Sequence, residues 1–172
     1  MFQHKYFKLL IMALLLGLSV WQFVEKNIGN GIFLLILAII VLFFYIRNEY
    51  ILMAYLRMRK QDMEGAEKWL RKINNPSQAL IKPQQASYYM MLGLIHSGKN
   101  INQAEKYLRK ALKTGLILKQ EEALAKLSLA GVLAAKRRKR EALNLLNEAK
   151  KLDKKGLLRE NIQMLKQQLK RI

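Results

Sequence analysis

One helical segment of the chain returns twice at a constant interval. AEKWLRKI at residues 66–73 comes back as AEKYLRKA at 104–111, and its skeleton appears again as ALNLLNEA at 142–149. Both intervals are 38 residues, and in each copy an alanine, a leucine and a third small or apolar residue follow one another at spacings of four and three. These spacings place the three residues on one helix face. Self-similarity at a fixed period indicates stacked helical units, each of which buries that face against a neighbour.

Composition divides the chain into two unequal parts. Residues 1–46 are mostly apolar, whereas residues 47–172 carry nearly all of the charge. Two runs without a charged residue, 9–24 and 28–46, are separated by only three residues. A helix needs about 20 apolar residues to span a bilayer. The pattern therefore predicts a membrane anchor over residues 1–46, formed by two transmembrane helices at about 6–24 and 28–46.

Two alternatives to this hairpin stay open. Lys5 and Lys8 precede an apolar run, as in a secretory signal peptide, but no small-x-small cleavage site follows Val20 and a second apolar run begins almost at once. The other alternative is a re-entrant hairpin that enters the membrane and returns on the same side. Both alternatives keep the apolar segment in contact with a membrane.

The basic residues that flank the two runs predict an orientation. Lys5 and Lys8 precede the first run, and Arg47, Arg57 and Arg59 follow the second. The positive-inside rule then places both termini and the charged domain at the cytoplasmic face of the cell (inner) membrane. The absence of cysteine is compatible with that reducing compartment. Neither Pro nor Gly interrupts the segment after the second run, which predicts one continuous helix leading into the charged domain. The alternative is a hinge near residues 47–49.

Three segments of the charged domain resemble tetratricopeptide repeats, whose units are antiparallel helix pairs with small residues where the helices cross. Ala54 and Ala66 are twelve residues apart, as small residues of that family are. LGLIHSGKNINQAEKYLRKAL at 92–112 contains a Leu-Gly pair and a glycine in the interhelix turn, and AGVLAAKRRKREALNLLNEA at 130–149 repeats the first glycine. The resemblance implies an all-α fold in which residues 47–155 form a right-handed α-solenoid of about three repeats. Their expected bounds are about 47–80, 85–118 and 122–155.

The connections between these units are expected to absorb the residues by which the period exceeds that of the family. Residues 74–85, which include Pro76 and Pro83, form the longest connection, and residues 113–122 are predicted to extend a helix around Gly115. Residues 156–172 close the domain. Leucines and isoleucines at spacings of four and three predict an amphipathic helix there. This helix either caps the last repeat, as such arrays require, or docks a partner.

The sequence offers little for catalysis. It has no cysteine nucleophile, only two histidines, His4 and His96, and no glycine-rich loop between a strand and a helix. Its acidic pairs have no further ligands at the spacing that metal sites require. We therefore expect a protein that is not an enzyme, with no catalytic residue, no cofactor and no metal.

A partner groove follows from the resemblance. In this family the first helix of each unit lines the inner groove, and alignment of the units places Met90 and Leu94 there from one repeat and Ser128 and Val132 from the next. An apolar groove with one hydroxyl suits an amphipathic helix of a protein partner. The alternative is that these four residues pack inside a tight superhelix.

Residues 47–172 contain 28 Lys and Arg against 11 Asp and Glu. The densest cluster is the candidate basic patch, expected on an exposed turn of the third repeat: Lys136, Arg137, Arg138, Lys139 and Arg140. Its charge fits an acidic protein, whose association it would accelerate. It also fits an anionic leaflet or nucleic acid, although no aromatic residue for base stacking lies within the cluster.

Together these features predict a membrane-anchored, non-catalytic adaptor or scaffold that recruits or positions a protein partner at the cytoplasmic face of the membrane, alone or within a larger membrane complex. The alternative is a membrane tether for nucleic acid or ribosomes, or an anionic-lipid-binding module, that acts through the basic surface.

Overall fold

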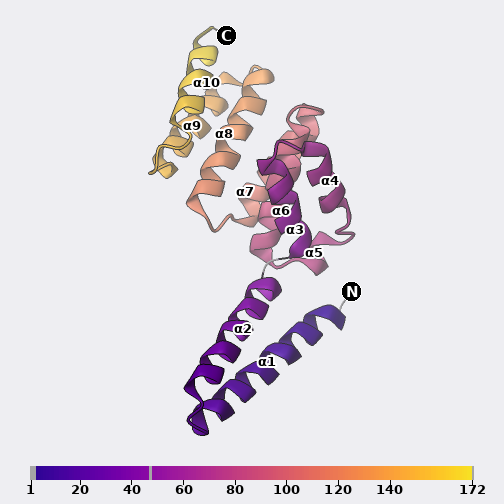
Figure 1. Cartoon of the computed structure of the whole chain (residues 1–172). Helices are drawn as coiled ribbons and strands as arrows, with labels where there is room; N and C mark the ends of the chain where they lie inside the picture. The colour runs from indigo at the N-terminus through magenta and orange to yellow at the C-terminus, as the bar shows by residue number, and fades with distance from the viewer. Residues whose placement is uncertain (1–2, 47, 172) are drawn as a thin grey trace. The chain divides into compact units, whose positions relative to one another are not determined.

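The computed structural model describes residues 3–46 and 48–171, with the side chains of 9–42 and 48–171. Its described residues form ten helices and no strand (Figure 1), which confirms the all-α class. The chain divides into two compact units, Met1–Leu52 and Met53–Ile172, and each is described by itself.

The helices have the following bounds: α1 Gln3–Val24, α2 Ile28–Ile46, α3 Glu49–Arg59, α4 Met63–Arg71, α5 Pro76–Ala79, α6 Lys82–His96, α7 Ile101–Thr114, α8 Lys119–Ala135, α9 Lys139–Leu152 and α10 Arg159–Arg171.

Helices α1 and α2 form a hairpin whose interface is made by small residues. Ser19 and Ala38 are almost fully buried between the helices, and Gly31 is buried with them. The Ser19 hydroxyl donates a hydrogen bond of 2.8 Å to the Gly31 carbonyl. Small side chains at this interface let the two helix backbones approach closely.

The large side chains of this hairpin point away from the interface. Sixteen large apolar residues among the described part of α1 and α2 are exposed, including Leu14, Phe33 and Ile36. No helix within the described residues combines the length and the apolar character needed to cross a bilayer. Lys5, Lys8 and Arg47, on which the predicted orientation depends, lie outside the described side chains.

The predicted continuous helix after the second apolar run is wrong. Helix α2 ends at Ile46 and α3 begins at Glu49. Asn48 is not helical, and its side-chain oxygen accepts a hydrogen bond of 3.0 Å from the Tyr50 amide. Asparagine at this position satisfies an amide that the first turn of a helix leaves free, so Asn48 starts a new helix.

In the second unit, consecutive helices pack against one another. Helices α6 and α7 form one close pair and α8 and α9 another, while α4 contacts α6, α7 contacts α8 and α10 contacts both α8 and α9 (Figure 1). The nine repeated residues are all buried, as the spacing predicts: Ala66, Leu70, Ile73, Ala104, Leu108, Ala111, Ala142, Leu146 and Ala149.

The closest helix crossing occurs at Gly93. A Cβ atom at this position would lie 2.6 Å from Leu108 Cγ and 3.2 Å from the Leu108 amide nitrogen. Leu108 is fully buried and cannot move aside. Gly131 corresponds to Gly93 in the sequence comparison of the repeats, but its environment differs. A Cβ atom at Gly131 would meet only Leu165 Cδ2, at 3.9 Å.

The connections differ from the expectation in two places. Pro76 and Pro83 both lie in the first turn of a helix, α5 and α6 respectively, where a missing amide costs no hydrogen bond. The expected long connection at 74–85 is therefore partly helical. Helix α7 is not extended around Gly115, which has φ +94° and ends the helix at Thr114.

Helix α10 covers the last helix pair. Its residues Ile162 and Leu169 are buried. The turn before it is held by Asp153, whose carboxylate accepts hydrogen bonds from the amides of Leu157 at 3.1 Å and Leu158 at 2.8 Å. The apolar face of this predicted amphipathic helix is thus occupied by its own chain. Ile172 lies outside the described residues.

Candidate functional site

The connections of the second unit gather at two opposite ends. Residues 97–100 and 136–138, which join the close helix pairs, form what we call the turn end. Residues 80–81, 115–118 and 153–158, which lead from one pair to the next, form the loop end (Figure 1). This alternation follows from short connections, which force successive helices to run antiparallel.

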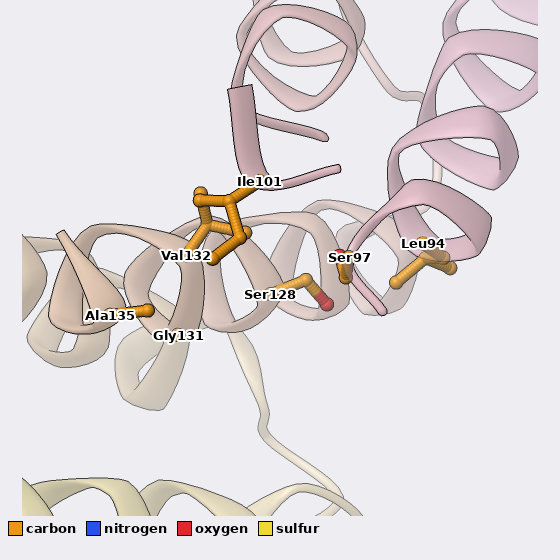
Figure 2. Close-up of a pocket in the computed structure, with 7 residues that line it drawn as sticks. All are labelled: Leu94, Ser97, Ile101, Ser128, Gly131, Val132 and Ala135. Atoms are coloured by element: carbon orange, nitrogen blue, oxygen red, sulfur yellow. The ribbon is translucent and has the colours of Figure 1, made fainter. Parts of the chain in front are cut away.

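A hollow of about 230 Å³ opens near the turn end, between α6, α8 and the start of α7. Figure 2 shows its lining residues, which come from three helices and one turn. The lining is mostly apolar, with two hydroxyl groups and one bare glycine: Leu94, Ser97, Ile101, Ser128, Gly131, Val132 and Ala135.

Three of the four residues expected in a groove meet around this hollow. Leu94 comes from α6, and Ser128 and Val132 come from α8 (Figure 2). Met90 does not line it, because Met90 is buried in the core with 3% of its surface exposed. Whether the hollow binds a partner stays a prediction.

Four further lining residues escaped the sequence analysis. Gly131 and Ala135 follow Ser128 at spacings of three and seven, so the helical period could have indicated them. Ser97 lies in the turn after α6, and Ile101 is the first residue of α7. Only the packing of α7 beside α8 brings these two to the hollow.

The two hydroxyls of the hollow differ in their hydrogen bonding. Ser97 Oγ donates to the Gly93 carbonyl at 2.8 Å and is satisfied within its own helix end. The Ser128 hydroxyl forms no hydrogen bond with the residues that the structure describes. Among the described residues that line the hollow, Ser128 is therefore the one whose side chain is free to form a hydrogen bond with a ligand.

The candidate basic patch is not a uniform exposed turn. The turn comprises residues 136–138, and Lys139 and Arg140 begin α9. Lys136 Nζ contacts Glu105 Oε2 at 2.6 Å. Arg138 contacts the carboxylates of both Glu105 and Glu141. The patch therefore divides into two cations that join neighbouring helices and three exposed ones that form no ion pair with the described residues, Arg137, Lys139 and Arg140.

Glu105 is the centre of this ion-pair cluster. The hydrogen bond from Lys136, with a further one from Arg109, lowers its pKa from 4.5 to about 2. Only 12% of its side chain is exposed, and burial by itself disfavours the charged form of a carboxyl group. The carboxylate is stable as an anion because these cations neutralise it.

The same contact occurs one repeat earlier. Glu67, which precedes Glu105 by one period, pairs with Lys99 in the following turn at 3.1 Å. Hydrogen bonds from Arg71 and Lys99 lower the pKa of Glu67. At the turn end, basic residues thus serve as links between consecutive units.

The aromatic residues of the second unit form a packed cluster. Tyr88 meets the edge of Tyr89, with ring centroids 5.3 Å apart, and Tyr89 stacks on Tyr107 at 6.4 Å. His96 contacts the edge of the Tyr107 ring at 5.4 Å. Burial raises the pKa of Tyr88. These rings pack against one another, and His96 packs with them.

Among the residues that the structure describes, no three His, Cys, Asp or Glu side chains gather as they would around a metal ion.

Comparison of the chain with protein-family models, with curated proteins and with solved structures gave no match.

Proposed function

We propose that this protein is a membrane-anchored adaptor in which the hairpin of α1 and α2 is embedded in a bilayer and a tetratricopeptide-like array holds a helix of a protein partner. The observation that carries the partner-binding role is the hollow at which Leu94, Ser128 and Val132 meet. The partner is an acidic protein, and the adaptor acts by raising its local concentration at the membrane.

Exposed apolar side chains support the anchor. The largest contiguous apolar patch of a typical soluble monomer is about 300–600 Å². Here large apolar side chains are exposed along both helices of the hairpin, and residues 9–24 and 28–46 contain no charged residue. A bilayer is the medium that removes such a surface from water on all sides. By the positive-inside rule the array lies at the cytoplasmic face.

The repeat and its crossings support the tetratricopeptide-like array. The 38-residue period coincides with buried alanine and leucine residues on α4, α7 and α9. A glycine permits the closest crossing, between α6 and α7. These features match helix pairs stacked in a solenoid.

The lining and the surrounding charge together define the partner. An apolar hollow flanked by one free hydroxyl accepts an apolar side chain of an amphipathic helix. Arg137, exposed in the turn just beyond Ala135, lies close along the chain to the rim of the hollow. Acidic residues on the polar face of the bound helix would meet this cation and would associate faster because of the positive charge of the domain.

The test is co-purification of the full-length protein from membranes in mild detergent with Ile101→Glu as the variant. Ile101 is 40% exposed on the rim of the hollow and begins α7, where a carboxylate is compatible with the helix dipole. The matched control is Met164→Glu on α10, 57% exposed and outside the hollow. We expect a stoichiometric protein partner that survives nuclease treatment, is lost with Ile101→Glu and is retained with Met164→Glu.

Two outcomes would contradict the adaptor proposal. Retention of the partner by Ile101→Glu would show that the hollow does not bind it. Recovery of RNA or ribosomal proteins alone, lost on nuclease treatment or at high salt, would replace the adaptor by a nucleic-acid tether, whose phosphate contacts are steeply salt-dependent.

A further inference from the structure

The two ends of the array differ in how many of their cations are paired. At the turn end, Lys99, Lys136 and Arg138 are bound to carboxylates of neighbouring helices, while Arg137, Lys139 and Arg140 form no ion pair with the described residues. At the loop end, none of the basic residues has an ion-pair partner among the described residues. These exposed residues are Lys82, Lys113, Lys119, Lys154, Lys155 and Arg159.

Exposed apolar side chains occupy the same connections as these free cations. Ile81 is 47% exposed, Ile117 72%, Leu118 50% and Leu157 69%. Each lies within a few residues of one or more of the free lysines. Every connection at the loop end therefore presents an apolar tip with a positive flank.

Hydrogen bonds between successive helix pairs of the array show that these connections share one edge. Ser87, near the start of α6, donates to Glu121 at the start of α8 over 3.1 Å. Gln120 donates to Asp153, at the end of α9, over 3.3 Å. Figure 1 shows the α7–α8 and α9–α10 connections at the same end of the array.

We propose that the loop end is a lipid-contacting edge: Ile81, Ile117, Leu118 and Leu157 insert into the interface of an anionic bilayer while the flanking lysines contact its headgroups. This inference rests on the proposed membrane anchor. Apolar side chains beside lysines are the pattern of interfacial binding, which combines burial of apolar area with attraction to anionic lipid. The hollow, near the turn end, stays accessible to a protein partner.

The test uses single-cysteine variants of the full-length protein, which has no cysteine of its own. A polarity-sensitive fluorophore is attached at Ile117→Cys at the loop end, at Gly98→Cys at the turn end, or at Ile36→Cys in the hairpin. Gly98 is exposed, and a side chain there meets nothing within 4 Å. Each protein is reconstituted into vesicles of phosphatidylcholine alone or with about 30% phosphatidylglycerol, which supplies the anionic surface of a cytoplasmic leaflet.

We expect the label at Ile117 to brighten at least about twofold in the anionic vesicles and to be quenched by spin-labelled lipid, because its surroundings become less polar. The label at Gly98 should show neither change. Lys119→Glu with Lys154→Glu should abolish the response at Ile117. Arg137→Glu with Arg140→Glu, the same charge change at the turn end, should leave it intact.

The hairpin label separates the two proposals. If the label at Ile36 is quenched by spin-labelled lipid while the label at Ile117 behaves like that at Gly98, the anchor stands and the lipid-contacting edge is wrong. An equal response at Ile117 in phosphatidylcholine alone would exclude the role of the lysines. If the label at Ile36 is not quenched, the anchor is wrong, and the lipid-contacting edge that depends on it falls as well.

Discussion

Lys136 Nζ lies 2.6 Å from Glu105 Oε2 and joins the turn between α8 and α9 to the first turns of α7. The two residues are 31 positions apart in the chain. Arg109 and Arg138 contact the same carboxylate, so a single acidic side chain holds three cations that the sequence alone shows only as excess charge.

Removal of that carboxylate should destabilise the array. We expect Glu105→Gln to lower the free energy of unfolding by about 1–2 kcal/mol, since charge-assisted hydrogen bonds at a largely buried acceptor are lost. Chemical unfolding of the full chain in mild detergent measures this change. Glu160→Gln on the exposed start of α10 is the control, with an expected change of about 0.5 kcal/mol or less. Equal effects of the two variants would contradict the central role of Glu105.

The same carboxylate predicts a pH dependence. Its pKa is lowered from 4.5 to about 2 in the folded protein, so the folded state binds fewer protons than the unfolded state between these values. The stabilisation is fully present above pH 4.5 and is lost as the pH falls from 4.5 towards 2. The difference in unfolding free energy between the parent protein and Glu105→Gln should be constant from neutral pH down to about 5 and then shrink. A difference that grows on acidification would show the opposite sign of linkage.

Two glycines on equivalent helices should respond oppositely to alanine. Gly93→Ala places a Cβ atom against buried Leu108 and should destabilise the protein by about 1–3 kcal/mol. Gly131→Ala meets only a normal contact with Leu165 and should stabilise α8 by up to about 1 kcal/mol, because alanine favours the helix. Thermal unfolding of both variants decides the point, and a neutral Gly93→Ala would show that the α6–α7 crossing can relax.

Charge reversal within the basic patch should depend on position. Arg138→Glu places a carboxylate beside Glu105 and Glu141 and should cost about 1–2 kcal/mol of stability through the lost pairs. Arg140→Glu, exposed in the first turn of α9, should change stability by less than about 0.5 kcal/mol. Comparison of their denaturation midpoints tests this, and it also identifies Arg140 as a position where charge can be reversed without unfolding the array.

Asp153 should control the entry to α10. Asp153→Ala removes the acceptor of the Leu157 and Leu158 amides and of the Gln120 side chain. We expect a loss of about 1–3 kcal/mol and faster hydrogen exchange at those two amides. Asp153→Asn, which retains one acceptor oxygen, should have a smaller effect. Unchanged exchange in the alanine variant would show that packing of Ile162 and Leu169 suffices to hold the turn.

Local pattern determined much of the fold. The spacing of Ala104, Leu108 and Ala111 is a property of one helix, so the buried face could be identified from the sequence. The resemblance to tetratricopeptide repeats implied Leu94, Ser128 and Val132 as groove residues, and all three line the hollow. Where neighbouring residues decide a helix end, the pattern was less informative. The break before Glu49 was predicted only as an alternative, and the helix end at Gly115 was missed.

The sequence by itself determined the all-α class, the apolar character of the first 46 residues and the positions of the repeated buried residues, because each depends on composition or on a helical period. Only the tertiary structure decided that Met90 is core, that Ser97 and Ile101 join the hollow, and that Lys136 is neutralised while Lys119 is free. Burial and ion pairing depend on which side chains meet between helices, and these side chains can be more than 30 residues apart in the chain. The strength of an ion pair depends on the distance between its charges, and the periodicity of a sequence does not give that distance.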